Sequence, residues 1–285
     1  MDENDALITF CILHTSRLNC TKQCTNSIAK YTDVGHLIKV LRQGYTDKET
    51  ETYFKEMEKR DNFEVLRLKE NIGVSAGRKM LIDQANTPLI MTLDNDIYLT
   101  ENWFKPIIEV LEKNEDIGVV GIPRYRFNGE LDGIGGRKIK IINNVVYTEK
   151  PKLERNEQFI LVDDVCGAIL FRQEVKSDFA FDPQFFMEFS DLDKGLQLLA
   201  SSWKKIVCLR SKVIHDHVGM RNLNYVAKRM NYAETSRAYA KFRKKWGLRL
   251  PRERHLMLKY IYPFILPPLY KTSHKLKNII RRAHI

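Results

Sequence analysis

The sequence predicts an α/β protein in which a mainly parallel sheet is flanked by helices. Over the first 125 residues, short apolar runs that suit buried strands alternate with segments of helical spacing. Strand–helix alternation of this length is typical of a parallel sheet covered by helices. The alternation stops after Pro123, and from Arg221 onward the sequence is helical in pattern, basic and rich in aromatic residues. We therefore expect a helical basic extension, residues 221–285, beyond the α/β domain.

The elements of the first half follow one another in a regular order. Each predicted strand is a short apolar run, and each predicted helix repeats apolar residues at the helical period. The predicted strands are 7–13, 36–41, 63–68, 89–93 and 118–122, and the predicted helices are 18–30, about 48–59, 74–85 and 101–113. Beyond Pro123 the sequence predicts a hairpin at 137–148, a strand at 159–171 and a helix at about 191–200.

Composition limits the classes of protein to consider. The chain has 285 residues, of which 44% are hydrophobic and 29% charged, as is typical of a globular domain. Its 47 Lys and Arg against 36 Asp and Glu give a net charge of +11, which favours nucleic acid, an anionic membrane or a phosphate-bearing ligand as partner. The acidic start lacks the pattern of a secretory signal, and no window reaches the ~18 consecutive apolar residues of a membrane span. The five cysteines are expected to be free thiols in a reducing cytoplasm.

Two carboxylates follow the predicted strand 89–93 directly. Asp94 and Asp96 are separated by one residue, so in extended backbone they point roughly the same way. Ligands of parallel sheets collect at the carboxyl ends of strands, and like charges this close repel each other unless a cation lies beside them. Mg²⁺ and Mn²⁺ prefer such oxygen ligands and complete their coordination with water and phosphate. The alternative is an Asp-rich turn that caps the next helix, and this pattern alone favours neither.

A second group of titratable residues lies further along the chain. Asp191 and Asp193 begin a predicted helix, and Glu188 precedes it in an aromatic-rich segment. Carboxylates at a helix start are often only caps or dipole partners. This interpretation easily explains one of the three, but it explains all three together less well. His215 and His217 alternate on an extended segment, so both can face one side. Neutral imidazole is a good metal ligand, although a lone histidine is more often structural.

Five blocks in a fixed order resemble the inverting glycosyltransferases of family 2, which have a GT-A fold. The resemblance covers roughly residues 6–220. It rests on NIGVSAGRKM (71–80), LDND (93–96), DDVCGAILFRQEV (163–175), FDPQFFMEFSDLD (181–193) and KVIHDHVG (212–219). It implies a GT-A domain over 1–220, with a nucleotide-sugar half at 1–125 and an acceptor and catalytic half at 126–220. The extension 221–285 lies beyond these blocks.

The resemblance also implies a role for each matching residue. Asp191 would be the general base, and Asp96 would hold a divalent metal, Mn²⁺ or Mg²⁺, with His215 completing or supporting that site. The nucleotide-sugar-binding residues would be Thr15, Arg17, Arg42, Arg78, Asp94, Asn95 and Gly167, and the secondary candidates are Glu188, Asp193 and His217. One displacement inverts the anomeric centre, and the sequence offers no obvious activated Ser or Cys for a covalent intermediate.

Three residues depart from the family pattern. Arg42 stands where an aspartate usually recognises the nucleobase. Lys79 replaces the asparagine of the G-R-N segment, and Ser190 replaces the glutamate that usually precedes the general base. Arginine cannot accept a proton from uracil, but it can donate to base oxygens or to phosphate. A UDP sugar is therefore the first expectation for the donor, with a GDP sugar second. These departures also keep open an alternative function, a catalytically silent sugar-nucleotide-binding scaffold of the same fold.

The C-terminal extension mixes basic and aromatic residues. In YAETSRAYAKFRKKWGLRL (232–250), aromatic residues recur at helical spacing with Lys and Arg between them. Such a helix either packs on the domain with its basic face in water or lies at an anionic membrane surface. No recognised motif supports nucleic-acid binding, so nucleic acid is not expected as a partner. The sequence therefore predicts a cytoplasmic glycosyltransferase, peripheral at the inner face of the cell membrane, that uses a glycan or lipid-linked acceptor in cell-surface polysaccharide or glycolipid synthesis.

Overall fold

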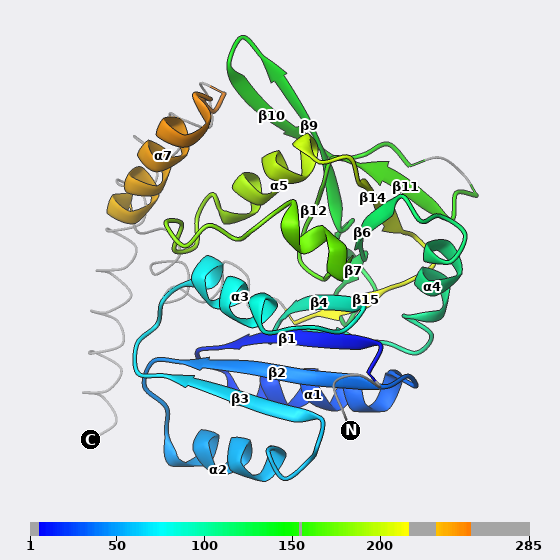
Figure 1. The fold of residues 1–285 in the computed structure, drawn as a ribbon, viewed down its shortest axis with the longest axis vertical. Helices are drawn as coiled ribbons and strands as arrows, with labels where there is room; N and C mark the ends of the chain where they lie inside the picture. The colour runs from blue at the N-terminus through cyan, green and yellow to red at the C-terminus, as the bar shows by residue number, and fades with distance from the viewer. Residues whose placement is uncertain (1–5, 154–155, 217–231, 252–285) are drawn as a thin grey trace, which may run out of the picture. The chain divides into compact units, whose positions relative to one another are not determined.

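The computed structural model describes residues 6–153, 156–216 and 232–251 (Figure 1). The chain divides into two compact units. The first unit comprises Met1–Ile139, Thr148–Phe186 and Ser190–His217, and the second comprises Lys140–Tyr147, Met187–Phe189 and Val218–Ile285. The domain boundaries at residues 125 and 220 stay a prediction from the sequence.

The first unit is built on a mixed eight-stranded sheet with the strand order β11-β14-β6-β13-β4-β1-β2-β3. The pairs β1–β2, β2–β3, β1–β4 and β6–β14 are parallel, whereas β13 is antiparallel to β4 and β6, and β11 is antiparallel to β14. The predicted α/β class with a mainly parallel sheet is confirmed. The strands are β1 (Ile8–His14), β2 (His36–Gln43), β3 (Phe63–Leu68), β4 (Leu89–Asp94), β6 (Ile117–Gly121), β11 (Phe159–Val162), β13 (Ile169–Arg172) and β14 (Lys204–Cys208), and the helices are α1 (Leu18–Tyr31), α2 (Lys48–Met57), α3 (Val74–Asp83), α4 (Lys105–Leu111) and α5 (Ser190–Ala200).

Side chains on β1 alternate between two buried clusters, one on each face of the sheet. Phe10 and Ile12 belong to one cluster, and Cys11 and Leu13 belong to the other. Helices α1 and α4 contribute apolar residues to the first cluster, and α3 and α5 contribute to the second. Because helices cover both faces, the carboxyl ends of the strands are where polar side chains can reach a ligand.

Two predicted elements differ from the observed ones. The predicted strand 159–171 is divided into β11, the short β12 (Asp164–Val165) and β13, since Gly167 adopts a φ of +82° that breaks the extended backbone. The predicted helix 101–113 shortens to α4, which has a proline in its first turn.

A separate four-stranded sheet has the order β5-β15-β7-β8. Its strands are β5 (Ile97–Leu99), β15 (Val213–His215), β7 (Arg124–Tyr125) and β8 (Leu131–Gly133). β5 begins directly after Asp96 and pairs antiparallel with β15, so that Ile97 lies opposite His215. This pairing brings the end of the LDND block beside a histidine that is far away in the sequence.

The second unit contains the turn of a hairpin and the helix α7 (Tyr232–Trp246). β9 (Gly136–Ile142) and β10 (Val145–Glu149) confirm the predicted hairpin. Within this unit the ring of Phe189 lies 5.6 Å from that of Tyr239 and 5.1 Å from that of Phe242 on α7. The predicted helical extension is confirmed over α7, and the rest of 221–285 lies outside the described residues apart from 247–251. No helix in the described part of the chain is long and apolar enough to cross a membrane.

Candidate functional site

The candidate site lies at the carboxyl ends of β1 and β4. Leu13 near the end of β1 pairs with Asp94 at the end of β4. The loop after β1 carries Thr15, which is exposed, and Arg17, whose φ of +64° is in the left-handed region. A non-glycine residue in this region is uncommon, and such residues are frequent at functional sites.

Arg78 connects two of the predicted site residues. It lies on α3 and is only 5% exposed. Its Nη2 donates to Asp94 Oδ1 at 2.7 Å, and its Nη1 lies 3.6 Å from Asp191 Oδ1. The guanidinium also lies over the ring of Phe181, 5.2 Å from its centroid. The structure therefore brings the aspartate of the LDND block and the candidate base to the same buried cation.

Asp191 is half-exposed at the start of α5 and lies among positive charges. Burial would raise the pKa of this carboxyl group, but the charge of Arg78, followed by those of Lys194 and Arg137, outweighs burial and lowers the pKa. The group is consequently ionised at neutral pH, as a proton acceptor must be.

A buried ion pair fixes the helix that carries Asp191. Lys194 is fully buried and donates to Asp164 and to the carbonyl of Val165. Asp164 also accepts from Arg137 Nε at 2.7 Å. Gly195 allows α5 to lie this close to Asp164, because a Cβ at this position would lie 2.6 Å from Asp164 Cγ. Removing one partner of such a pair leaves an uncompensated buried charge, so the arrangement holds α5 against β12.

Asp96 lies between a cation and a histidine. Its Oδ2 accepts from Arg17 Nη1 at 2.7 Å, and its Oδ1 lies 3.7 Å from His215 Nε2. Burial and the negative charge of Asp94 raise the pKa of Asp96, and His215 and Arg17 offset this only in part. A further cation beside Asp96 would therefore stabilise its ionised form.

The other ring nitrogen of His215 is bonded to Asp132 on β8. Nδ1 donates to Asp132 Oδ2 at 2.7 Å, an arrangement that places the imidazole lone pair on Nε2, toward Asp96. Asp132 also accepts from Arg126 Nε at 3.3 Å. Burial would raise the pKa of Asp132, but the bond from His215 and the nearby arginines lower it. A carboxylate behind a histidine in this way is the common support for a metal-binding imidazole.

The geometry of Asp96 and His215 fits a divalent cation shared with a phosphate-bearing ligand. Asp96 Oδ1 and His215 Nε2 are 3.7 Å apart, which is too long for a hydrogen bond. The separation is less than twice the ~2.1 Å metal–oxygen distance, so one ion between the two atoms could contact both. Among residues 6–153, 156–216 and 232–251, no group of three or more His, Cys, Asp or Glu side chains could hold a metal ion. An ion held here would need phosphate and water for its remaining ligands, as Mg²⁺ usually does.

Two further predicted residues serve to build the site. Asn95 Nδ2 donates to the Ser16 carbonyl and to Thr21 Oγ1, each at 2.9 Å, which ties the turn after β4 to the loop after β1. Arg42 Nη1 donates to the carbonyls of Gly44 and Leu68 at the ends of β2 and β3.

Gly167 is required by a neighbouring arginine. A Cβ at Gly167 would lie 1.7 Å from Arg124 Nη1, so a side chain there would displace this guanidinium, and the φ of +82° itself favours glycine. Arg124 also approaches Asp132, with 4.0 Å between Nε and Oδ2. This residue therefore links the glycine of the DDVCGAILF block to the support of His215.

The secondary candidates are placed differently from Asp191. Asp193 is fully buried and accepts from Gln197 Nε2 at 2.8 Å, while Gln197 also bonds Ala180, so this carboxylate serves the packing of α5. Glu188 belongs to the second unit. His217 lies outside the described residues.

Sequence reasoning missed four residues of the site. Asp132 and Arg124 lie in turn-rich sequence, and their contacts arise only from the pairing of β7 with β8 and β15. Asp216 accepts from Arg17 Nη2 at 3.2 Å. Lys194 stands between Asp193 and Gly195 in a mixed polar segment, so its burial cannot be predicted from the local sequence.

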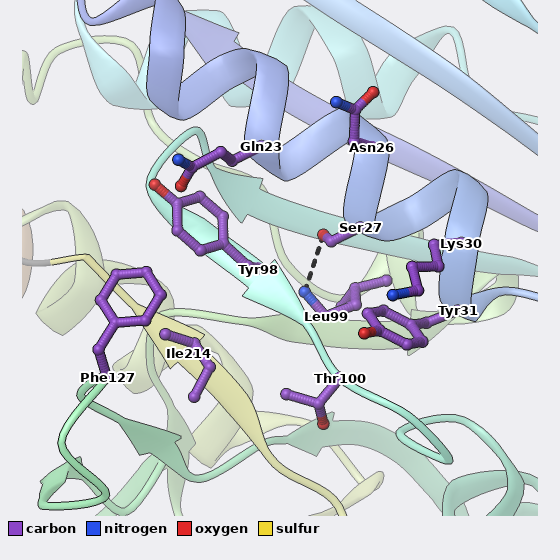
Figure 2. A pocket seen from close by; sticks show the side chains of 10 residues that line it. All are labelled: Gln23, Asn26, Ser27, Lys30, Tyr31, Tyr98, Leu99, Thr100, Phe127 and Ile214. Atoms are coloured by element: carbon purple, nitrogen blue, oxygen red, sulfur yellow. Dashed lines mark hydrogen bonds between the residues drawn. The ribbon is translucent and has the colours of Figure 1, made fainter.

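A pocket of about 360 Å³ lies beside the site (Figure 2). It is formed by α1, β5, β15 and the turn that carries Phe127. Tyr98 in its wall donates to Asp216 Oδ2 at 3.1 Å, and its ring lies 5.9 Å from that of Phe127. Figure 2 also shows the bond from Leu99 N to Ser27 Oγ, 2.9 Å long, which closes the pocket toward α1.

The match to known sequences identifies the family. The model of glycosyl transferase family 2 matches residues 12–179, which is more than half of the chain. The chain therefore belongs to glycosyltransferase family 2, and the resemblance seen in its sequence is confirmed. No curated protein sequence matches it.

Solved structures agree with a GT-A fold. GalNAc-T7, crystallised with UDP, GalNAc and Mn²⁺, has a TM-score of 0.61 at 15% identity over 92% of this chain and 58% of its own. Residues 1–349 of TarS from S. aureus give a TM-score of 0.58 at 14% identity, over 89% of this chain and 75% of that one. The chain thus spans less than two thirds of the GalNAc-T7 chain.

Proposed function

We propose that the protein is a metal-dependent inverting glycosyltransferase that moves a sugar from a nucleotide-diphosphate donor to a glycan or lipid-linked acceptor. The observation that carries the proposal is the position of Arg78 between Asp94 and Asp191. Two carboxylates with different tasks, one on the donor side and one as base, lie at the same end of the sheet.

Asp191 acts as the base in this proposal. The acceptor hydroxyl is a poor nucleophile, and a carboxylate in line behind the anomeric carbon takes its proton as the new glycosidic bond forms. Arg78 keeps Asp191 ionised and fixes its direction, and the ion pair of Lys194 with Asp164 fixes the helix. One displacement then inverts the anomeric centre without a covalent intermediate.

Asp96 and His215 would hold Mn²⁺ or Mg²⁺, and such an ion, when bound, neutralises the charge of the departing nucleotide diphosphate. Arg17 pairs with Asp96 and Asp216, which places a second positive charge at the donor side. Arg78 contributes a third near Asp94.

The donor is proposed to be a UDP sugar first and a GDP sugar second. UDP is present in the GalNAc-T7 structure, which shares this fold. Thr15, Asn95 and Gly167 would line the donor site. Arg42 would lie near the nucleobase, because it pairs with His14 near the carboxyl ends of β2 and β1. The proposed acceptor is a membrane-bound glycan, and α7 with its basic last turn would provide peripheral contact with the membrane.

Binding of nucleotide sugars tests the proposal directly. Thermal unfolding should be measured with UDP, GDP, CDP and dTDP sugars, each with and without Mn²⁺. A ligand present at 100 times its Kd raises the unfolding free energy by about 2.7 kcal/mol, which is a readily measured shift in Tm. We expect one nucleotide class to stabilise the protein and to do so only with metal. Hydrolysis of that donor then separates an enzyme from a silent binder, and no stabilisation by any donor would contradict the proposal.

A further inference from the structure

We infer that the tip of the β9–β10 hairpin enters an anionic lipid surface beside the basic end of α7. The inference rests on the membrane contact proposed above and adds an apolar element to it. Its evidence is the exposure of the hairpin, its turn and its hydrogen bonds to the segment after α7.

The hairpin exposes two consecutive isoleucines. Ile141 and Ile142 are 47% and 54% exposed, and Tyr147 on the returning strand is 37% exposed. Consecutive residues in a strand point to opposite faces, so Ile141 and Ile142 expose apolar surface on both faces of the tip, whereas Val146 on the returning strand is buried. Exposed apolar groups gathered in this way mark an interaction site.

The turn gives the tip a defined shape. Asn143 and Asn144 have φ values of +50° and +60°, as in the two-residue turns that favour asparagine. Residues 138–148 contain two lysines and no acidic residue, so the part of the hairpin nearest the turn carries no negative charge, and its first acidic residue on the returning strand is Glu149 at the end of β10. The backbone of the strands is paired, which lowers the cost of placing it at an interface.

The hairpin is bonded to the segment that follows α7. Val146 N donates to the Arg249 carbonyl at 2.9 Å, and Arg249 N donates to the Asn144 carbonyl at 2.8 Å. The last turn of α7 contains Arg243, Lys244 and Lys245, and these side chains are exposed, as is Arg249. The apolar tip and the basic cluster therefore belong to one compact unit.

This combination fits lipid better than nucleic acid. Basic residues near an anionic membrane attract it, and apolar side chains that enter the head-group region add to the binding. A nucleic-acid site would use the same charge, but its phosphates offer nothing to two exposed isoleucines. We therefore assign the surface formed by residues 140–147 and the last turn of α7 to a phospholipid surface of negative charge.

Vesicle flotation of the full chain tests the inference. The vesicles should contain phosphatidylcholine alone or with roughly one third phosphatidylglycerol, so that only the second type is anionic. The test variant is the double change Ile141→Asn and Ile142→Asn. The matched control is Leu153→Asn with Leu161→Asn, because these two leucines are 55% and 52% exposed in the other unit. A third variant, Lys244→Gln with Lys245→Gln, tests the charge of α7.

The expected result is binding to anionic vesicles only, weakened about tenfold by the isoleucine changes and by the lysine changes, and unaffected by the leucine control. If the lysine changes weaken binding and the isoleucine changes do not, α7 alone contacts lipid and the inference is wrong. If the wild type does not float with anionic vesicles, both the inference and the membrane contact are wrong, while the donor-binding test above still stands. If the isoleucine variant changes from dimer to monomer in light scattering, the tip is a self-association surface, which overturns the inference.

Hydrogen exchange gives a second readout on the unmodified protein. Anionic vesicles should slow amide exchange in residues 140–147 and leave exchange in β11 unchanged. Equal exchange with and without vesicles would overturn the inference even if every variant were poorly folded.

Discussion

Arg78 donates to Asp94 at 2.7 Å and lies 3.6 Å from Asp191, so one buried guanidinium joins two carboxylates that are far apart in the sequence. In the mechanism proposed above, a donor-side carboxylate and a base would have to lie on the same side of the sheet for a single displacement to occur. Their shared contact with Arg78 meets this requirement.

Asp191→Asn should abolish transfer while leaving donor binding intact. Loss of a general base typically lowers the rate by a factor of about 10²–10⁴, and the amide cannot accept the hydroxyl proton. Initial rates and donor Kd should be measured on the same preparation. Asp193→Asn is the control, since this buried residue bonds Gln197 and its loss should lower stability more than kcat. A variant at Asp191 with full activity would remove the base assignment.

Asp96→Ala should weaken donor binding only where that binding depends on metal. The change removes the carboxylate next to His215 and leaves Arg17 without its closest partner. Calorimetric titration with the donor, with and without Mn²⁺, measures the difference. Asp116→Ala, a change at an exposed residue paired with Lys204, should leave both values as in the wild type. Equal donor affinity in the wild type and the Asp96 variant under both conditions would count against the metal site.

Asp132→Asn should raise the apparent Kd for Mn²⁺, measured with UDP present, by about tenfold. Partners that orient a metal-binding histidine typically contribute 10- to 100-fold to metal affinity. Paramagnetic resonance of free Mn²⁺ measures the change without any turnover. Glu130→Gln, two residues earlier in the chain and exposed, is the matched control. An unchanged Kd in the Asp132 variant would show that this residue does not orient His215 toward a metal.

Arg78→Met should move the acidic limb of the profile of kcat/KM against pH to higher pH. Burial raises the pKa of Asp191 and the charge of Arg78 is the first influence that lowers it. Removing that charge raises the pKa, and since the base must be ionised, activity is then lost at a higher pH as the solution becomes acidic. A merely structural role of Arg78 would lower activity equally at every pH.

Acid should destabilise the fold through His14, a buried residue at the end of β1. Burial, together with the positive charge of Arg42, lowers the pKa of His14 from 6.5 to about 4. The unfolded chain therefore binds this proton first as pH falls. The stability that depends on neutral His14 is complete above pH 6.5, declines as pH falls, and is lost by about pH 4, a difference of about 3 kcal/mol. Urea unfolding across this range measures it, and His14→Gln should flatten the dependence; an equally steep slope in that variant would exclude His14 as its source.

The site residues that the sequence predicts lie within short, continuous blocks of the chain. The run from Leu89 into Asp94 and Asp96 places two carboxylates at the end of a strand whatever the rest of the chain does. Asp191 likewise lies in the first turn of a helix within the block 181–193, which the local sequence predicts.

The remaining part arises from pairings between short, distant strands. Asp132 reaches His215 only because β8 joins β7, and β7 joins β15, in one small sheet. Strands of two or three residues carry too little periodicity to be predicted. Lys194 and Asp164 similarly meet only when α5 packs on β12, and the backbone break at Gly167 divided a strand that the apolar run had predicted to be continuous.

A crystal structure of the protein with its stabilising nucleotide sugar and Mn²⁺ is the most direct test of the central claim. We expect metal density touching Asp96, a diphosphate next to it, and the anomeric carbon facing Asp191 on the side away from the leaving group. A donor bound elsewhere, or one whose anomeric carbon and Asp191 lie on different sides of the sheet, would contradict it.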